Sequence, residues 1–211
     1  MKVQIEYYTL DIPSKLGGVF LDVGCCDGLY TDSLYTHVNQ VYAFEANRAS
    51  YEALVKKYQS YDNIEVVHAL VGNGYDQKPF FVHGKNKACS TVYKCDGVQD
   101  YADAVTLDTL SIDSMHIKDV SIVKIDTEGC EAEILSGCVD TLTRCRPILL
   151  IEVHDHMNPG HILYIRELLD SLGYTSTDIP IPAYLSMGQV GPFQGSDLYK
   201  RHFHILAKVS E

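Results

Sequence analysis

The sequence of 211 residues has no tryptophan and no apolar run long enough to cross a membrane. Its longest apolar stretches, such as residues 148–151, have the length of a strand, whereas a membrane-spanning helix needs about 20 apolar residues. The segment that begins Met1-Lys2 also lacks the apolar stretch of a secretory signal. We therefore expect a cytoplasmic protein that does not bind membranes.

Positive charge is scarce as well. The chain has 17 lysine and arginine residues against 28 aspartate and glutamate residues, which gives a formal net charge of −11. A protein that grips a phosphate backbone needs a basic stripe, and the densest basic positions here (56–57, 85–87 and 200–201) are short and scattered. We therefore expect no nucleic-acid partner.

The seven cysteines lack the spacing of a disulfide framework or a zinc site. Their number is odd, Cys25 and Cys26 are adjacent, and no CxxC pair occurs. Disulfide frameworks use even sets of cysteines, and structural zinc sites commonly use CxxC-like pairs. We expect the cysteines to be reduced and mostly buried.

Predicted strands and helices alternate along the chain, which is long enough for a single domain over residues 1–211. The predicted strands are residues 19–23, 41–44, 64–71, 120–125, 148–153 and 202–209. The predicted helices are residues 29–38, 49–58, 131–143 and 162–172, the last closed by Gly173. This order predicts a doubly wound α/β fold with a mostly parallel sheet and helices on both faces.

Two irregular stretches interrupt this alternation. Residues 73–113 contain short β-like pieces separated by glycine, asparagine and aspartate, and they predict a β-rich insertion beside the main sheet. Residues 179–197 contain three prolines and predict a loop before the last strand. Long loops in compact domains are commonly lids or binding loops, so we expect both stretches to wall a ligand pocket. The alternative for the insertion is a sheet extension that makes contacts in a homo-oligomer.

A glycine loop follows the strand predicted over residues 19–23. Its sequence, including the end of that strand, is Asp22-Val23-Gly24-Cys25-Cys26-Asp27-Gly28. Gly24 permits a sharp turn at which a ligand can touch bare backbone, and Gly28 permits close approach of the next helix. The predicted ligand contacts in this loop are Asp22, Gly24, Cys25, Asp27 and Gly28.

The spacing of this loop favours S-adenosylmethionine over a dinucleotide. A dinucleotide loop has the pattern GxGxxG, whereas here two glycines bracket three residues and an acid precedes them. Asp22 would repel a pyrophosphate but could meet the ammonium of an amino acid. Glu45 ends the next predicted strand, at about the offset of 20 residues at which an acid can accept hydrogen bonds from ribose hydroxyls. Glu45 and the adjacent Ala46 are therefore predicted to contact the nucleoside.

Several further motifs, taken in order, resemble the FkbM family of methyltransferases. The segments Phe20-Leu21-Asp22-Val23-Gly24 and Phe44-Glu45-Ala46-Asn47 are similar to the opening of that family, and residues 105–110 (VTLDTL) resemble its "TLD" segment. Residues 123–137 (VKIDTEGCEAEILSG) resemble its signature "KIDxEGxE…VLxG", and residues 150–154 (LIEVH) its closing "IE-x-H". The pair Cys25-Cys26 departs from the small or amide residues common there.

The resemblance implies a class I methyltransferase with a seven-stranded Rossmann-like sheet and S-adenosylmethionine as its cofactor. It implies in-line SN2 transfer of a methyl group to a hydroxyl on a sugar or another small molecule. It does not identify the acceptor.

Acidic residues and histidines follow two of the predicted strands. Asp126, Glu128 and Glu131 follow one of them, and Glu152 and His154 lie at the end of the next. Because ligands bind at the carboxyl ends of strands in open α/β sheets, both groups should face the site. We expect Asp126 or Glu128 to hold the cationic end of the cofactor and His154 to be the base that takes the proton of the acceptor hydroxyl.

Other roles for this region stay open at this point. Its carboxylates and histidines could instead bind Mg²⁺ or Zn²⁺, although the spacing matches no specific metal motif and we predict no metal. Glu131 could merely cap the following helix, and Lys124 could be an ion-pair partner. His156, His161, His202 and His204 are expected at the surface or at an edge.

Three rival functions also remain. The first is a metal-assisted O-methyltransferase of the same fold. The second is a non-catalytic module that binds a nucleoside. The third is an NAD-dependent oxidoreductase, which the spacing of the glycine loop disfavours.

Overall fold

The computed structural model describes residues 2–5, 8–11, 16–74, 76–84, 90–93, 101–155, 157–179 and 202–209. Its main sheet has seven strands in the order β11-β12-β10-β9-β3-β4-β5. Their bounds are β3 Val19–Val23, β4 Gln40–Glu45, β5 Ile64–His68, β9 Val120–Ile125, β10 Ile148–His154, β11 Tyr174–Ile179 and β12 His202–Val209. The pairs from β10 to β5 are parallel, and β12 is antiparallel to both of its neighbours. The predicted doubly wound, mostly parallel seven-stranded sheet is thus confirmed.

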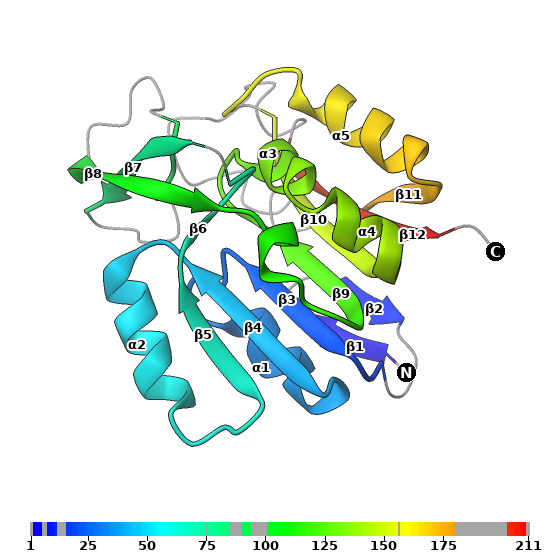
Figure 1. Ribbon diagram of the computed structural model, residues 1–211, viewed down its shortest axis with the longest axis horizontal. Coiled ribbons are helices and arrows are strands. Elements are labelled where there is room, and N and C mark those ends of the chain that lie inside the picture. The colour runs from blue at the N-terminus through cyan, green and yellow to red at the C-terminus, as the bar shows by residue number, and fades with distance from the viewer. Residues whose placement is uncertain are drawn as a thin grey trace, which may run out of the picture.

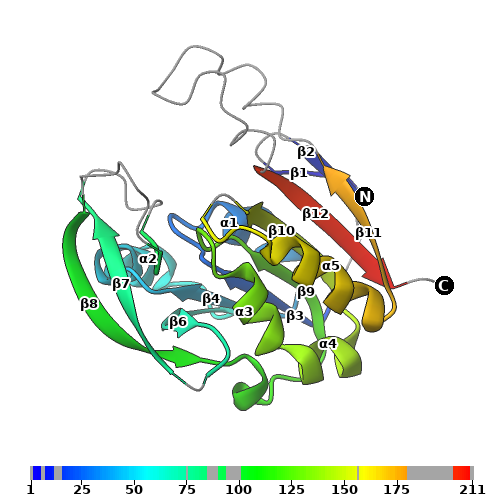
Figure 2. The ribbon, with the colours of Figure 1, turned by 90° about the horizontal axis from the view of Figure 1, so that it is seen from above.

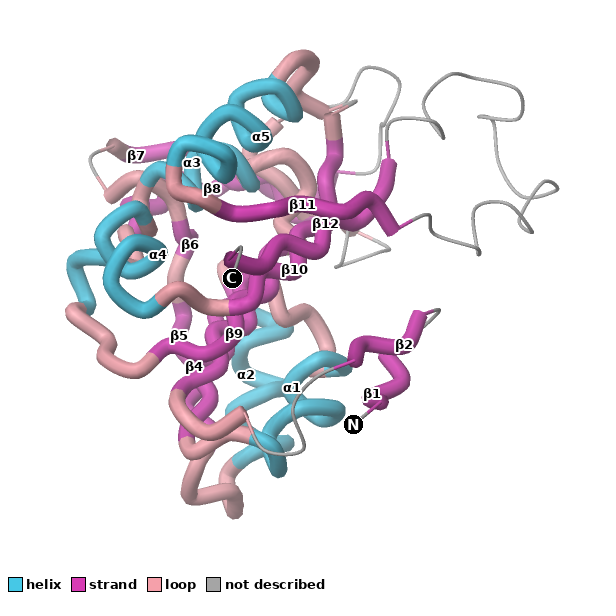
Figure 3. Tube along the Cα trace, turned by 90° about the vertical axis from the view of Figure 1, so that its right-hand side faces the viewer, coloured by secondary structure: helices cyan, strands magenta, loops and turns pink. Residues whose placement is uncertain are grey.

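Helices cover both faces of this sheet, as Figure 3 shows. On one face lie α1 (Leu29–Leu34) and α2 (Arg48–Tyr58), and on the other lie α3 (Glu131–Ser136), α4 (Val139–Cys145) and α5 (His161–Ser171). Because successive side chains of a strand point to opposite faces, the neighbours Phe20 and Leu21 belong to two separate apolar clusters. The sheet is therefore buried on both faces, which explains the nearly continuous apolar composition of its central strands.

Two predicted helices were too long. The helix predicted over 131–143 is interrupted at Gly137, where an added Cβ would lie only 2.1 Å from the backbone oxygen of Gly72. The glycine allows this close approach, and the chain starts a new helix at Val139. The helix predicted over 29–38 ends at Leu34 and continues as a 3₁₀ turn, η1 (Tyr35–His37).

Some strands were not predicted. β11 has the sequence YTSTDI, which lacks an apolar run, and it pairs with β12 at the edge of the sheet. An antiparallel hairpin of β1 (Lys2–Ile5) and β2 (Tyr8–Asp11) precedes the main sheet. The alternation of strands and helices along the chain predicted β12 as a strand. Apolar composition does not reveal the direction of a strand, so the antiparallel pairing of β12 was not predicted.

Two strands of the insertion, β7 and β8, join β6 in a separate three-stranded sheet with the order β6-β8-β7. Its strands are β6 (Leu70–Val71), β7 (Gln77–His83) and β8 (Tyr101–Leu110), and a 3₁₀ turn, η3 (Asp113–Met115), follows them. The strand predicted over 64–71 is therefore divided between two sheets. Figures 1 and 2 show β7 and β8 at the side of the molecule away from β11 and β12.

The described residues bear on the expectations for the cysteines and for membrane-spanning helices. The cysteines among them, at positions 25, 26, 130, 138 and 145, are free. No helix in the described ranges is long and apolar enough to span a membrane. Most of the loop predicted over 179–197 lies outside the described residues, so its predicted role stays untested.

Candidate functional site

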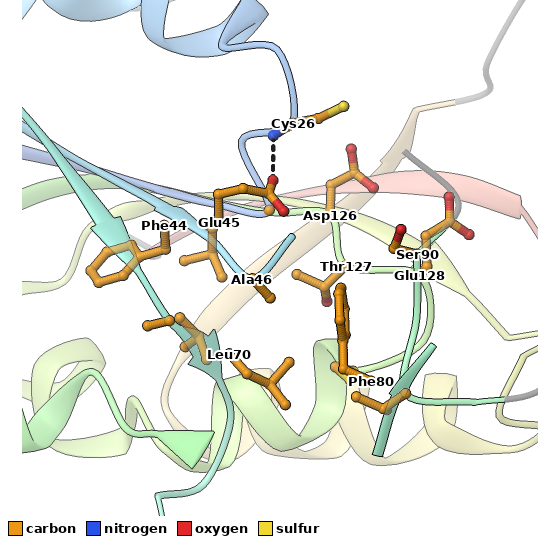
Figure 4. Close-up of a pocket in the computed structure, with 16 residues that line it drawn as sticks. Cys26, Phe44, Glu45, Ala46, Leu70, Phe80, Ser90, Asp126, Thr127 and Glu128 are labelled. Carbon is orange, nitrogen blue, oxygen red and sulfur yellow. Dashed lines mark hydrogen bonds between the residues drawn. The ribbon is translucent and has the colours of Figure 1, made fainter. Parts of the chain in front are cut away.

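A hollow lies at the carboxyl ends of β3, β4 and β9 and is closed on one side by the insertion. It encloses about 540 Å³ of space outside the atoms, open solvent included. Polar side chains of Asp126, Glu128 and Ser90 gather at one side of it, and Phe44 and Leu70 lie at the other (Figure 4). Its lining residues are Val23, Gly24, Cys26, Phe44, Glu45, Ala46, Ala69, Leu70, Val71, Phe80, Ser90, Val92, Asp126, Thr127, Glu128 and Cys130.

Position 24 requires a glycine because the backbone of Asp126 passes close to it. Its φ is +75°, and an added Cβ would lie 1.9 Å from the backbone oxygen of Asp126. The amides of Gly24 and Cys25 both donate to the carbonyl of Phe44, at 3.0 and 3.1 Å. The loop therefore offers bare backbone to the hollow, as predicted for Gly24, but these two amides already have partners inside the protein.

Glu45 ends β4 with its carboxylate in the hollow, where Ala46 also lies. Its Oε2 accepts a hydrogen bond of 2.9 Å from the amide of Cys26, drawn in Figure 4, and its Oε1 accepts one of 2.6 Å from the amide of Asn47. Burial raises the pKa of Glu45 to about 7 despite these two amides. Each carboxylate oxygen has a second lone pair, so Glu45 keeps acceptor capacity for a ligand.

Asp22 is fully buried beneath the loop. Its Oδ2 accepts a hydrogen bond of 2.8 Å from Thr31, and its Oδ1 lies 3.4 Å from Nζ of Lys124. Although burial alone would lower it, Asp126 and Asp22 raise the pKa of Lys124 well above its ordinary value, so the lysine stays charged. The prediction of Lys124 as an ion-pair partner is confirmed, whereas a contact of Asp22 with a ligand ammonium stays a prediction.

Cys25, Asp27 and Gly28 are not among the described residues that line the hollow. The Asp27 carboxylate accepts a hydrogen bond of 3.3 Å from the amide of Leu29 and so covers the start of α1. An added Cβ on Gly28 would lie 2.1 Å from the hydroxyl of Tyr58, which donates to the Gly28 carbonyl. The packing of Tyr58 thus accounts for this glycine, and ligand contacts of these three residues stay predictions.

Glu128 lines the hollow in an unusual backbone conformation. Its φ of +54° lies in the left-handed region that non-glycine residues rarely adopt. Thr91 of the insertion donates a 2.7 Å hydrogen bond to the Glu128 carbonyl and helps to hold this turn. Burial raises the pKa of Glu128 to about 7, and His154 opposes that rise.

His154 lies among carboxylates at the end of β10 and is almost fully buried. Its Nδ1 is 2.9 Å from Oε1 of Glu131, and its Nε2 is 3.6 Å from Glu128 and 4.0 Å from Asp126. Although burial alone would lower it, Glu128 and Glu131 raise the pKa of His154 well above its ordinary value. A protonated imidazole cannot accept a proton, so this environment disfavours the predicted role of His154 as base.

Two expectations about neighbouring residues were wrong. Glu131 does more than cap α3: it is fully buried, accepts the amide of Gly129 at 2.9 Å and pairs with His154. His161 was expected at the surface but is buried, with its Nε2 3.5 Å from Oε2 of Glu131. The side chains of His156, His202 and His204 lie outside the described part of the chain.

Sequence reasoning missed several lining residues. Phe80, Ser90 and Val92 come from the insertion, which was predicted to wall a pocket without its contact residues being identified. Thr127 was passed over because threonine carries no motif signal. Its Oγ1 is buried and has no hydrogen-bond partner among the described residues. Such an orphaned polar atom in a hollow indicates a place for a ligand.

Comparisons with solved structures show a shared fold. A methyltransferase FkbM from Methylobacillus flagellatus KT superposes with a TM-score of 0.61 at 15% identity, covering 93% of this chain and 44% of that one. An rRNA methylase from Streptococcus thermophilus has a TM-score of 0.53 at 12% identity, with 93% and 89% covered. SMU.1697c from Streptococcus mutans, in complex with SAH, has a TM-score of 0.52 at 13% identity, with 90% and 88% covered.

The family comparison is more specific than these structural likenesses. No curated protein matches the sequence significantly. The chain also spans less than half the length of the Methylobacillus flagellatus protein. The model of the family described as "Methyltransferase FkbM domain" matches residues 22–176, well over half of the chain and including both polar ends of the hollow. The chain therefore belongs to the FkbM family of S-adenosylmethionine-dependent methyltransferases.

Proposed function

We propose that this protein transfers the methyl group of S-adenosylmethionine to a hydroxyl of a small molecule, such as a sugar or another natural product. The observation that carries this proposal is a single hollow with Glu45 at one end and the Asp126 and Glu128 carboxylates at the other. The first end suits a nucleoside, and the second suits a reacting hydroxyl.

The residues of the hollow fit the cofactor. Phe44 and Leu70 offer an apolar surface for the adenine, and Glu45 has spare acceptor capacity for the ribose hydroxyls. Gly24 offers bare backbone, and the orphaned Thr127 hydroxyl offers a polar partner. We propose that these residues, together with Ala46 and Cys26, hold the cofactor.

The chain's own residues must hold the acceptor and accept its proton. Bound S-adenosylmethionine supplies an electrophilic methyl carbon, whose bond to sulfur breaks, leaving the electron pair on sulfur, as the bond to the acceptor oxygen forms. A hydroxyl is a poor nucleophile until its proton is taken. Glu128 lines the hollow, so we assign it as the residue that receives the proton.

His154 acts in this proposal as a positioning residue. It is not among the described lining residues, and only 2% of its side chain is exposed. Its Nε2 faces Glu128 at 3.6 Å and Asp126 at 4.0 Å, so its effect on the acceptor passes through these carboxylates. This assignment replaces the sequence-based choice of His154 as base.

The acceptor is proposed to be small and not a nucleic acid. The net charge of −11 argues against a phosphate backbone as substrate, although an rRNA methylase shares the fold. The insertion residues Phe80, Ser90 and Val92 narrow the hollow from one side. A cytoplasmic location and homo-oligomer contacts through the insertion remain predictions from the sequence.

An acceptor screen tests the proposal. The full chain is incubated with methyl-labelled S-adenosylmethionine and a panel of sugars and hydroxylated natural products, beside a panel of amines and RNA. Label on the oxygen of a hydroxylated compound, lost in Glu128→Gln, is the expected result. Label on nitrogen would contradict O-methylation, and label on RNA would contradict a small-molecule acceptor. Cofactor binding with no label on any compound would favour the non-catalytic nucleoside-binding alternative.

A further inference from the structure

The carboxyl ends of β9 and β10 bring together ligand atoms of the kinds that bind metal ions. We infer that Asp126, Glu152 and His154 form a binding site for a divalent transition-metal ion such as Mn²⁺ or Zn²⁺. One carboxylate oxygen of each acid and one imidazole nitrogen lie within 4.8 Å of one another. Glu152 and His154 lie on β10, where their backbone pairs with β12, and Asp126 directly follows the neighbouring strand β9.

The separations suit a single ion. Nε2 of His154 lies 4.0 Å from Oδ1 of Asp126 and 3.8 Å from Oε1 of Glu152. Metal–ligand bonds of about 2.0–2.2 Å place two ligands of one ion no more than about 4.4 Å apart. Both separations fall below that limit and above the length of a direct hydrogen bond. An ion therefore fits between these atoms with small side-chain adjustments.

The imidazole is held in the orientation that a metal ligand needs. Nδ1 of His154 lies 2.9 Å from Oε1 of Glu131, which is itself fixed by the amide of Gly129. Histidines that bind metals commonly donate their second ring N–H to a carboxylate, which fixes the tautomer and leaves the other nitrogen to the metal. Here the second nitrogen, Nε2, faces the carboxylates of Asp126 and Glu152.

The charge of the region also favours a cation. Four carboxylates, those of Asp126, Glu128, Glu131 and Glu152, have an oxygen within 4.0 Å of the His154 ring nitrogens. Lys124 contacts this group through Oδ2 of Asp126 at 3.5 Å but is shared with Asp22. The side chains of His154 and Glu152 are only 2% and 13% exposed, so bulk water does not fully screen the charge of these carboxylates.

The donor set indicates the class of ion. One imidazole with two carboxylates is softer than the all-oxygen sites of Ca²⁺ and Mg²⁺ and suits ions between Mn²⁺ and Zn²⁺. Such an ion would make an approaching hydroxyl more acidic and so assist its loss of a proton to Glu128. This catalytic consequence rests on the proposed function, whereas binding of the ion does not.

Titration of the full chain with Mn²⁺ tests the site. The protein is treated with a chelator and dialysed, and free Mn²⁺ is followed by electron paramagnetic resonance. Wild type should bind one Mn²⁺ per chain, and Asp126→Asn and Glu152→Gln should each weaken binding at least about tenfold. Glu65→Gln removes a charge from an exposed position of β5 and should leave binding unchanged. Zn²⁺ should displace the bound Mn²⁺.

Two results would overturn the site: no Mn²⁺ bound by folded wild type, or equal affinity in the ligand variants and in Glu65→Gln. Circular dichroism checks the fold of each variant, and if one fails to fold, the other decides. S-adenosylhomocysteine binding is measured on the same wild-type sample. Mn²⁺ binding without S-adenosylhomocysteine binding would refute the proposed function alone. The reverse would refute the ion site alone.

Discussion

The two polar ends of the hollow place buried carboxylates in different surroundings. At the end of β3 and β4, Asp22 forms an ion pair with Lys124, and the Glu45 carboxylate accepts hydrogen bonds from two backbone amides. At the end of β9 and β10, several carboxylates surround the single imidazole of His154. At the first end a lysine and backbone amides lie against the carboxylates, whereas at the second end the described neighbours of the His154 ring are carboxylates.

In the proposed function, the first end binds the cofactor and the second end carries out the reaction. A carboxylate held by two backbone amides is fixed in place and can orient ribose hydroxyls without moving. Carboxylates gathered around a histidine can exchange protons with it or hold a cation together with it.

Removing the lysine that pairs with buried Asp22 should destabilise the fold strongly. Lys124→Met leaves Asp22 buried with Thr31 as its remaining described partner, which should lower the free energy of unfolding by about 3–5 kcal/mol. Lys57→Met removes a half-exposed partner of Asp32 and should cost about 1 kcal/mol or less. Urea unfolding measures both. Equal losses of unfolding free energy in the two variants would show that the buried pair of Lys124 and Asp22 stabilises the fold no more than the exposed pair does.

Removing a carboxylate from the second end should affect catalysis more than folding. Glu128→Gln should lower kcat by about 10²-fold or more, because the acceptor proton loses its receiver. Its affinity for S-adenosylhomocysteine should stay within about twofold of wild type, because the lost interaction serves the reaction and not cofactor binding. Steady-state kinetics with the acceptor found by the screen, beside calorimetry, separates the two effects. An unchanged kcat would reject Glu128 as the proton acceptor.

Cofactor affinity should depend on pH through Glu45. Burial raises the pKa of Glu45 from 4.5 to about 7, and only the ionised form accepts hydrogen bonds with both oxygens. Affinity for S-adenosylhomocysteine should therefore fall by up to about tenfold between pH 8 and pH 6. In Glu45→Gln this dependence should flatten. A profile of the variant that matches wild type would assign the pH dependence to another group.

The same shift acts on folding with the opposite sign. Because the folded-state pKa of Glu45 is raised, its contribution to stability is fully present below pH 4.5 and is lost as the pH rises through about 7. Urea unfolding of the ligand-free protein at several pH values should show that the free energy of unfolding depends less on pH in Glu45→Gln than in wild type. A stability difference that does not change with pH would contradict it.

The sequence revealed the first end better than the second, for physical reasons. Strand periodicity and local spacing identify a glycine loop and an acid at the next strand end, and the structure places Gly24 and Glu45 together in the hollow. The contacts of Glu131 and His161 depend on how α3 and α5 pack against β10, which local patterns do not encode. Apolar composition likewise predicted that β12 is a strand. It predicted neither the direction of this strand nor its pairing with β11.

Gly28 shows that packing can also account for a residue of a motif. Its contact with a ligand stays a prediction, while the hydroxyl of Tyr58, 30 residues further along the chain, lies beside it. Phe80 and Ser90 show the reverse case, because they line the hollow without any motif. Both outcomes depend on contacts between segments distant in sequence.

Calorimetric titration with S-adenosylhomocysteine tests whether the hollow beside Glu45 holds the cofactor. Wild type should bind one ligand per chain, and Glu45→Ala should lose about 1.5–3 kcal/mol of binding free energy, since charge-assisted hydrogen bonds to ribose are removed. Glu65→Ala, an exposed acid on the neighbouring strand, should bind as wild type does. Wild-type affinity in a folded Glu45→Ala variant, or no binding by wild type, would contradict the account.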